Sequence, residues 1–84
     1  MNKRSREILS QLITKTEYSQ TISIQKLADM FKVSSRTIRY DIDQINDYLK
    51  ENHLQPLNLG KRGVINTEPD ITKARESLSE EGFY

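Results

Sequence analysis

The chain has 84 residues and a formal net charge of +1 at pH 7, which suits one domain with a modest core. It has no cysteine and a single histidine, so the sequence offers no disulfide, and one histidine cannot form a zinc site by itself. No apolar run exceeds two residues, so we expect a cytoplasmic protein without a secretory signal or membrane contact.

The small net charge conceals an asymmetry along the chain. Residues 1–66 hold 11 Lys and Arg against 7 Asp and Glu, whereas residues 67–84 hold 2 against 5. The basic front portion favours a polyanionic partner, which the acidic tail would repel. This charge distribution does not by itself indicate nucleic-acid binding, because charged side chains that only face water give a similar net charge.

Two helices are predicted before residue 32. The first covers residues 2–16, with its apolar side chains on one face, and the loop after it contains Ile22 as a candidate strand residue. The second covers Ile24 to Phe31 and follows Ser23, whose hydroxyl can cap a helix start. The stretch "KVS" then turns the chain, and we expect Val33 to insert into the core.

A third helix is predicted from Ser34 or Ser35 to about residue 52. It has a buried stripe and an opposite exposed stripe. The buried stripe contains Ile38, Ile42, Ile45 and Leu49; the exposed stripe contains Arg36, Tyr40, Asp43 and Asp47, flanked by Arg39 and Lys50. Asp41 lies between the stripes, and we expect it to form an orienting salt bridge with a partner that the sequence does not identify.

The remainder predicts a β-hairpin and a last helix. Leu57 and Leu59 alternate with Asn58, and "GKRG" separates them from Val64 and Ile65, as in a hairpin with Lys61 and Arg62 at its tip. The stretch "TEPD" at residues 67–70 resembles a capping box with proline in the first turn, and predicts a helix over about 68–81 that ends at Gly82. A frayed linker is the competing interpretation.

The order of these elements predicts a mainly α fold with a small β-hairpin: a winged helix-turn-helix, with a three-helix core, a wing and a C-terminal helix. In such an arrangement the helix after the turn enters the major groove of DNA. Serine and threonine hydroxyls can bind phosphate, arginine can reach guanine, and tyrosine can meet a phosphate or a sugar. The candidate DNA-binding residues are Ser34, Ser35, Arg36, Thr37, Arg39, Tyr40, Lys61 and Arg62.

Acidic residues limit the expected contact. Asp41, Asp43 and Asp47 would be repelled by phosphate, so DNA contact should involve residues 34–40 and leave the rest of the third helix outside. Lys3, Arg4 and Arg6 at the start of the first helix are weaker candidates for phosphate contact.

The segment "ISIQKLADMFKVSSRTIRYDIDQINDYL", followed by "LNLGKRGVIN", resembles the N-terminal winged helix-turn-helix domain of bacterial regulators. Its core "VS.RTIR.DI..IN..L" is similar to that of the DeoR-like and BglG/Mga-like groups, and most similar to PRD-containing transcriptional activators controlled by the sugar phosphotransferase system. The resemblance covers about residues 4–66, with the recognition helix at Ser34 to Leu49 and the wing tip at Gly60 to Gly63. One departure is Lys32, which stands near the place where many such turns have glycine.

This resemblance implies a DNA-binding domain over residues 1–66, and a helical linker over 67–84 leading toward a regulatory domain outside this sequence. It further implies that this chain is the DNA-reading module of a sugar-operon regulator, and that the partner of the module is double-stranded DNA. One module contacts few base pairs, so a homodimer on paired half-sites is expected in the full-length protein.

Other functions are less well supported by the residues. No catalytic set, metal-ligand spacing or phosphate-binding glycine loop is evident, so we expect no enzyme activity, cofactor, metal or small-molecule ligand in this domain. RNA binding is not favoured, because the sequence lacks a platform of aromatic side chains on which RNA bases could stack. A winged helix that binds a protein partner is the principal alternative, although such modules usually lose the basic residues that are kept here.

Overall fold

The computed structural model describes residues 1–80 and begins with helix α1, Lys3–Glu17. The Asn2 side chain caps this helix, because its Oδ1 accepts a hydrogen bond from the Ser5 amide at 2.7 Å. The apolar stripe of α1 is fully buried, as the sequence predicts. Its members are Ile8, Leu9, Leu12 and Ile13.

Helix α2, Ile24–Phe31, has the predicted bounds. Its cap is Ser23, whose Oγ accepts from the Lys26 amide at 3.1 Å. The helix ends at Lys32, which adopts the left-handed conformation with φ 55°. A lysine therefore occupies a conformation that glycine takes at lower cost, and the tight turn forms without a glycine.

Helix α3, Ser35–Glu51, follows directly, and the cap is Ser34 rather than Ser35. The predicted apolar stripe of this helix is buried. Val33 in the turn is only half-buried, but it packs against the core as expected.

The hairpin consists of β2, Asn58–Leu59, and β3, Val64–Asn66. A third strand, β1 (Ile22–Ser23), pairs antiparallel with the other edge of β3, so the sheet order is β1-β3-β2. The sheet is thus larger than the predicted hairpin, because β1 is recruited from the loop before α2.

The last helix begins differently from the prediction. A short 3₁₀ helix, η2 (Pro69–Lys73), precedes α4 (Ala74–Glu80), and the predicted stop at Gly82 lies outside the described residues. Proline does lie in the first turn, but no side chain caps η2. The expected capping box is wrong because the Thr67 hydroxyl instead hydrogen-bonds to that of Thr16 in α1.

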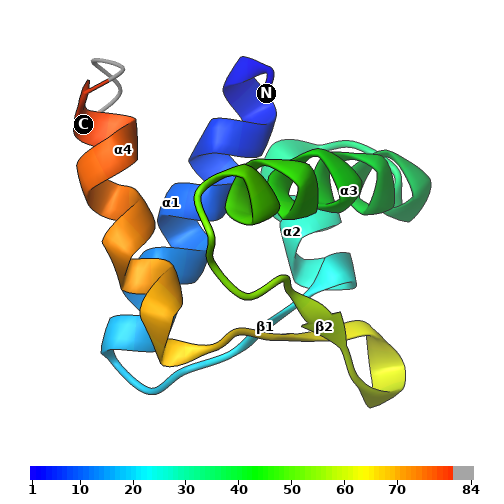
Figure 1. Ribbon diagram of the computed structural model, residues 1–84. Coiled ribbons are helices and arrows are strands. Elements are labelled where there is room, and N and C mark those ends of the chain that lie inside the picture. Colours follow the sequence, from blue (N-terminus) through cyan, green and yellow to red (C-terminus); the bar gives the residue numbers. More distant parts are fainter. Residues whose placement is uncertain (81–84) are drawn as a thin grey trace.

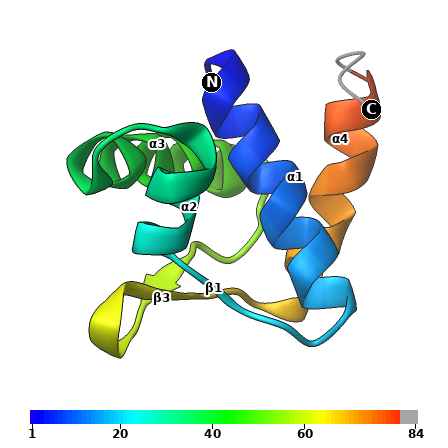
Figure 2. The same ribbon diagram turned by 180° about the vertical axis from the view of Figure 1, so that it is seen from behind.

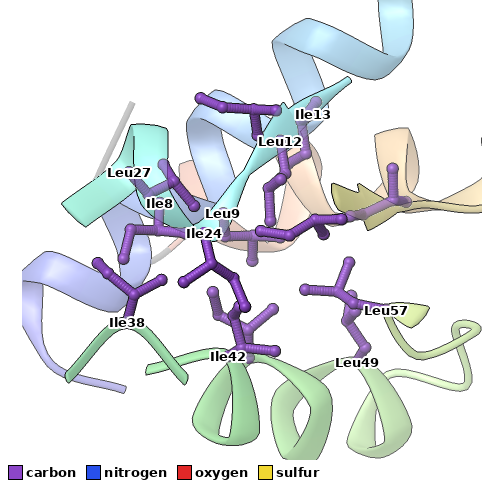
Figure 3. Packing of buried hydrophobic residues seen from close by; sticks show 14 of the residues in the cluster. Ile8, Leu9, Leu12, Ile13, Ile24, Leu27, Ile38, Ile42, Leu49 and Leu57 are labelled. Atoms are coloured by element: carbon purple, nitrogen blue, oxygen red, sulfur yellow. The ribbon is translucent and has the colours of Figure 1, made fainter. Parts of the chain in front are cut away.

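One hydrophobic core connects the helices with β1 and β3, whereas both residues of β2 are exposed. Figure 3 shows side chains of α1, α2 and α3 meeting one another, with Leu57 joining them from the segment before β2. Figures 1 and 2 show α4 alongside α1, where η2 and α4 contribute Ile71, Ala74 and Leu78 to the core. This is a winged helix-turn-helix architecture. No helix within residues 1–80 is long and apolar enough to cross a membrane.

Candidate nucleic-acid interface

The first turn of α3 is a compact group of hydroxyls and amides. The Ser34 Oγ accepts a hydrogen bond from the Thr37 amide at 3.2 Å, and the two hydroxyl oxygens lie 3.0 Å apart. The first backbone bond of the helix is donated by Ile38 to the Ser34 carbonyl. The amides of Ser35 and Arg36 precede that bond, so they have no acceptor within the helix and suit an anionic ligand.

Side chains that can contact DNA surround this helix start. Arg36, Arg39 and Tyr40 are exposed, and together with Thr37 and Asp43 they line an open depression on the surface of α3. Tyr40 is 65% exposed. Within residues 1–80, neither arginine forms an ion pair or hydrogen bond with a side chain, so both guanidinium groups can bind an external partner.

The start of α3 is also tied to α2. The Ser35 Oγ donates to the Gln25 Oε1 at 3.4 Å, and the Gln25 Nε2 donates to the Asp29 Oδ1 at 3.1 Å. Sequence reasoning missed this connection, because Gln25 is an exposed polar residue with no distinctive pattern around it. The connection helps to fix how α2 and α3 cross at the turn.

The wing provides a second basic group. Lys61 and Arg62 are exposed at the tip of the β2–β3 hairpin, where Arg62 and Gly63 both have positive φ. The hairpin is closed by a 2.7 Å hydrogen bond from the Gly60 amide to the Val64 carbonyl. Figures 1 and 2 show the wing and the first turns of α3 extending toward the same side of the molecule, away from α4.

Comparison with protein families matches residues 4–56 to the HTH domain, the helix-turn-helix family. The chain belongs to this family. The matched range contains α1, α2, the turn and α3, and this membership supports DNA binding by an HTH domain. No curated protein and no solved structure matches the chain.

An ion pair with a buried carboxylate supports α3 of this HTH domain. The Arg4 Nε lies 2.5 Å from the Asp41 Oδ2, and the guanidinium also donates to the Asp41 Oδ1 at 3.3 Å. The Asp41 side chain is completely buried, whereas one third of the Arg4 side chain is exposed. The hydrogen bond to Asp41 holds the pKa of the Arg4 guanidinium above its ordinary value, so this guanidinium remains protonated.

This pair corrects one expectation and completes another. Asp41 does form the expected salt bridge, but it lies inside the molecule rather than sideways between core and groove. Arg4, a candidate for phosphate contact, has this carboxylate as its partner instead. The sequence did contain a signal for this pair. An acidic residue lies at the edge of a buried helical stripe, and the first helix begins with basic residues.

A second link joins the same two helices of the HTH domain. The Ser5 Oγ lies 3.1 Å from the Gln44 Oε1, and Asn2 donates to Asp41 at 3.5 Å. The start of α1 therefore holds the middle of α3 through several polar contacts, which fixes the direction of α3. No group of three or more metal-ligating side chains occurs within the described part of the domain.

Proposed function

We propose that this HTH domain is the sequence-reading module of a bacterial transcription regulator that binds double-stranded DNA. The recognition helix, residues 34–49, enters the major groove by its N-terminal turns, and the wing tip, residues 60–63, lies on the phosphate backbone or in the minor groove. The proposed contact residues are Ser34, Ser35, Arg36, Thr37, Arg39, Tyr40, Lys61 and Arg62.

One observation carries this proposal: two exposed basic groups, which have no side-chain partner within residues 1–80, stand on segments that lie on the same side of the molecule. Arg36 and Arg39 belong to the start of α3, and Lys61 and Arg62 belong to the wing; the ribbon places these two segments on the same side (Figures 1 and 2). A duplex offers both partners at once, because base edges are exposed in the groove and phosphates border it. A protein partner would have to present matching acidic groups at both places.

The proposed roles follow from the chemistry of each group. The helix start and its hydroxyls bind a phosphate, which fixes the depth of insertion. An arginine forms a bidentate contact to guanine O6 and N7, which selects a base pair. The wing lysine and arginine neutralise neighbouring phosphates, and this raises affinity for all sequences alike.

We extend the proposal to the regulation of carbohydrate uptake or metabolism, through a PRD-containing, phosphotransferase-controlled regulator. Its support is the resemblance of "VS.RTIR.DI..IN..L" and the wing segment to those regulators. The genes beside the coding sequence provide the test, since sugar-transport genes are expected there. The domain should bind a fragment upstream of them more tightly than a scrambled fragment of the same length.

The dependence of DNA binding on salt tests the central proposal. Binding of the chain to labelled random-sequence and genomic duplexes is measured by fluorescence anisotropy over a range of salt concentrations. The logarithm of affinity should fall with the logarithm of salt concentration, with a slope of about −0.9 for each phosphate contacted. Absence of binding at low salt, or an affinity that salt does not change, would favour the protein-partner alternative.

Assembly is a separate part of the proposal. Because one module contacts few base pairs, the full-length protein should bind as a homodimer to two half-sites. Half-sites separated by one helical turn, about 34–36 Å, or by a multiple of it, should bind more tightly than half-sites with five base pairs added between them.

A further inference from the structure

Asp43 is an acidic residue within the basic part of the proposed interface. It is exposed, and it lines the same depression on α3 as Arg36, Thr37, Arg39 and Tyr40. It makes no ion pair or hydrogen bond with another side chain of residues 1–80, although Arg39 lies one helical turn away. The fold therefore leaves this carboxylate available to a partner outside the protein.

Helix geometry places Asp43 within reach of the bases. At 100° per residue, positions 36, 40 and 43 fall within about 60° of one another, so they share one face of α3. Asp43 is about 10 Å beyond Arg36 along the helix axis, which is less than the width of the major groove, about 12 Å. Asp47 lies on the same face about 16 Å beyond Arg36, and it falls outside that width.

Few groups in a duplex can accept this carboxylate. Phosphates repel it, and the groove edges of guanine and thymine present acceptors, so neither can donate to a carboxylate. Adenine has an amino group beside an acceptor nitrogen, whereas cytosine presents an amino donor alone. Cytosine is therefore the base whose groove edge best matches an exposed carboxylate.

We infer that Asp43 is a specificity-determining residue, which accepts a hydrogen bond from the amino group of a cytosine. This cytosine lies next to the base pairs that the arginines contact. The inference rests on the proposed function and adds to it a means of rejecting wrong DNA sites. A site without an amino group at this position leaves the carboxylate facing acceptors, and it is rejected for that reason.

The inference extends the groove-contacting face of α3 by one turn. The sequence alone confined contact to residues 34–40, on the ground that every aspartate would be repelled by phosphate. Asp43 shares its depression with both arginines, so an arrangement that inserts them also inserts Asp43. Repulsion by phosphate then helps to keep Asp43 over the bases, while the groove boundary excludes Asp47.

Selection from random duplexes tests this role. The chain, its Asp43→Asn variant and its Asp47→Asn variant are each used to enrich binding sequences, which are then read by sequencing. The unaltered chain should enrich cytosine at one position. Asp43→Asn should lose this preference by about tenfold and gain one for adenine, because an amide can bond both the amino group and N7 of adenine. Asp47→Asn should enrich the same bases as the unaltered chain.

The outcomes separate this inference from the proposed function. If Asp43→Asn enriches the same sequences as the unaltered chain, Asp43 reads no base, although DNA binding stands. If it changes only a guanine position, Asp43 acts by orienting an arginine and the inference is wrong. If the unaltered chain enriches nothing, both fail. Asp43→Ala, which should lose the cytosine preference without gaining adenine, and circular dichroism of each variant exclude misfolding as the cause.

Discussion

The beginnings of α1 and α3 both carry arginine, but these arginines have different surroundings. Arg4 on α1 binds Asp41 through two hydrogen bonds, and its carboxylate partner is completely buried. Arg36 and Arg39 on α3 are exposed and have no such partner within residues 1–80. One arginine connects two helices inside the protein, whereas the other two can bind an external ligand.

The position of the carboxylate decides the role of the arginine. Asp41 lies on the buried side of α3, where a charge requires a partner, and Arg4 satisfies that requirement. Asp43 lies on the exposed side, where water solvates both charges and an ion pair with Arg39 would contribute little. Two aspartates separated by one residue therefore belong to different parts of the molecule.

Among the substitutions that test this difference, replacing Asp41 should have the largest effect, and the effect is on the stability of the fold. Asp41→Ala removes the acceptor of the Arg4 guanidinium and leaves these partly buried donors without their partner, so we expect the free energy of unfolding to fall by about 2–3 kcal/mol. Urea denaturation followed by circular dichroism measures the change. Arg4→Ala should also destabilise the fold, and in the double variant the two effects should be less than additive.

Asp47→Ala is the matched control, because it removes an exposed aspartate from the same helix. Its free energy of unfolding should stay within about 0.5 kcal/mol of that of the unaltered chain. Equal effects of Asp41→Ala and Asp47→Ala would show that the buried pair does not stabilise the fold. The distinction between the two kinds of arginine would then be lost.

Replacing the exposed arginines should change base preference rather than stability. Arg36→Ala and Arg39→Ala should each cost about 1–3 kcal/mol of DNA-binding free energy and relax specificity at one base pair. Arg36→Lys provides the sharper measurement, because lysine keeps the charge but lacks the rigid planar fork of the guanidinium. It should retain most affinity for random DNA and lose discrimination, as judged by competition between duplexes that differ at one position.

These variants can also contradict the assignment of α3. Base preference that survives both alanine substitutions would mean that α3 does not read the bases. A large loss of folding stability in either variant would mean that these arginines resemble Arg4 after all.

A smaller effect is expected at the wing. Lys61→Ala should weaken binding to all sequences alike and make the salt slope less steep by about 1, because one phosphate contact is lost. Lys50→Ala is the control, since Lys50 is exposed in the last turn of α3, at the end away from the wing. A change of base preference in Lys61→Ala would instead place this lysine in a groove.

Local patterns predicted most of the fold. The bounds of α2, the cap at Ser23 and the buried stripe of α3 follow from residues close together in the sequence, so apolar spacing and cap chemistry were sufficient. The exposed positions of Arg36 and Arg39 follow in the same way, because the face opposite a buried stripe points to solvent.

Contacts between distant residues were not predictable in this way. Asp41 and Arg4 are 37 positions apart, and nothing in a local window selects Arg4 over its basic neighbours. Thr67 has the local signature of a cap, but its hydroxyl bonds to Thr16, 51 positions away. The same holds for the pairing of β1 with β3, which joins Ile22 to Ile65, because the sequence suggested a strand residue at Ile22 but not its partner. The exposed residues at the start of α3 can therefore be predicted from their sequence neighbours. The contacts that orient α3 cannot, because they join residues far apart in the sequence.

The smallest expected effect concerns the ion pair between α1 and the last helix. Arg75 donates two hydrogen bonds to the Glu17 carboxylate, and this contact holds the pKa of Glu17 below its ordinary value of 4.5. A lowered pKa in the folded state means that the unfolded state binds the proton more tightly. The pair therefore stabilises the fold above about pH 4.5, and this stabilisation is lost as the pH falls through the lower, folded-state pKa.

Both side chains are partly exposed, so the effect should be small and should weaken with salt. Urea denaturation of the unaltered chain and of Glu17→Gln should differ slightly at pH 7 and converge at the acidic limit. A difference that persists there would show that Glu17 stabilises α1 by a route other than its charge.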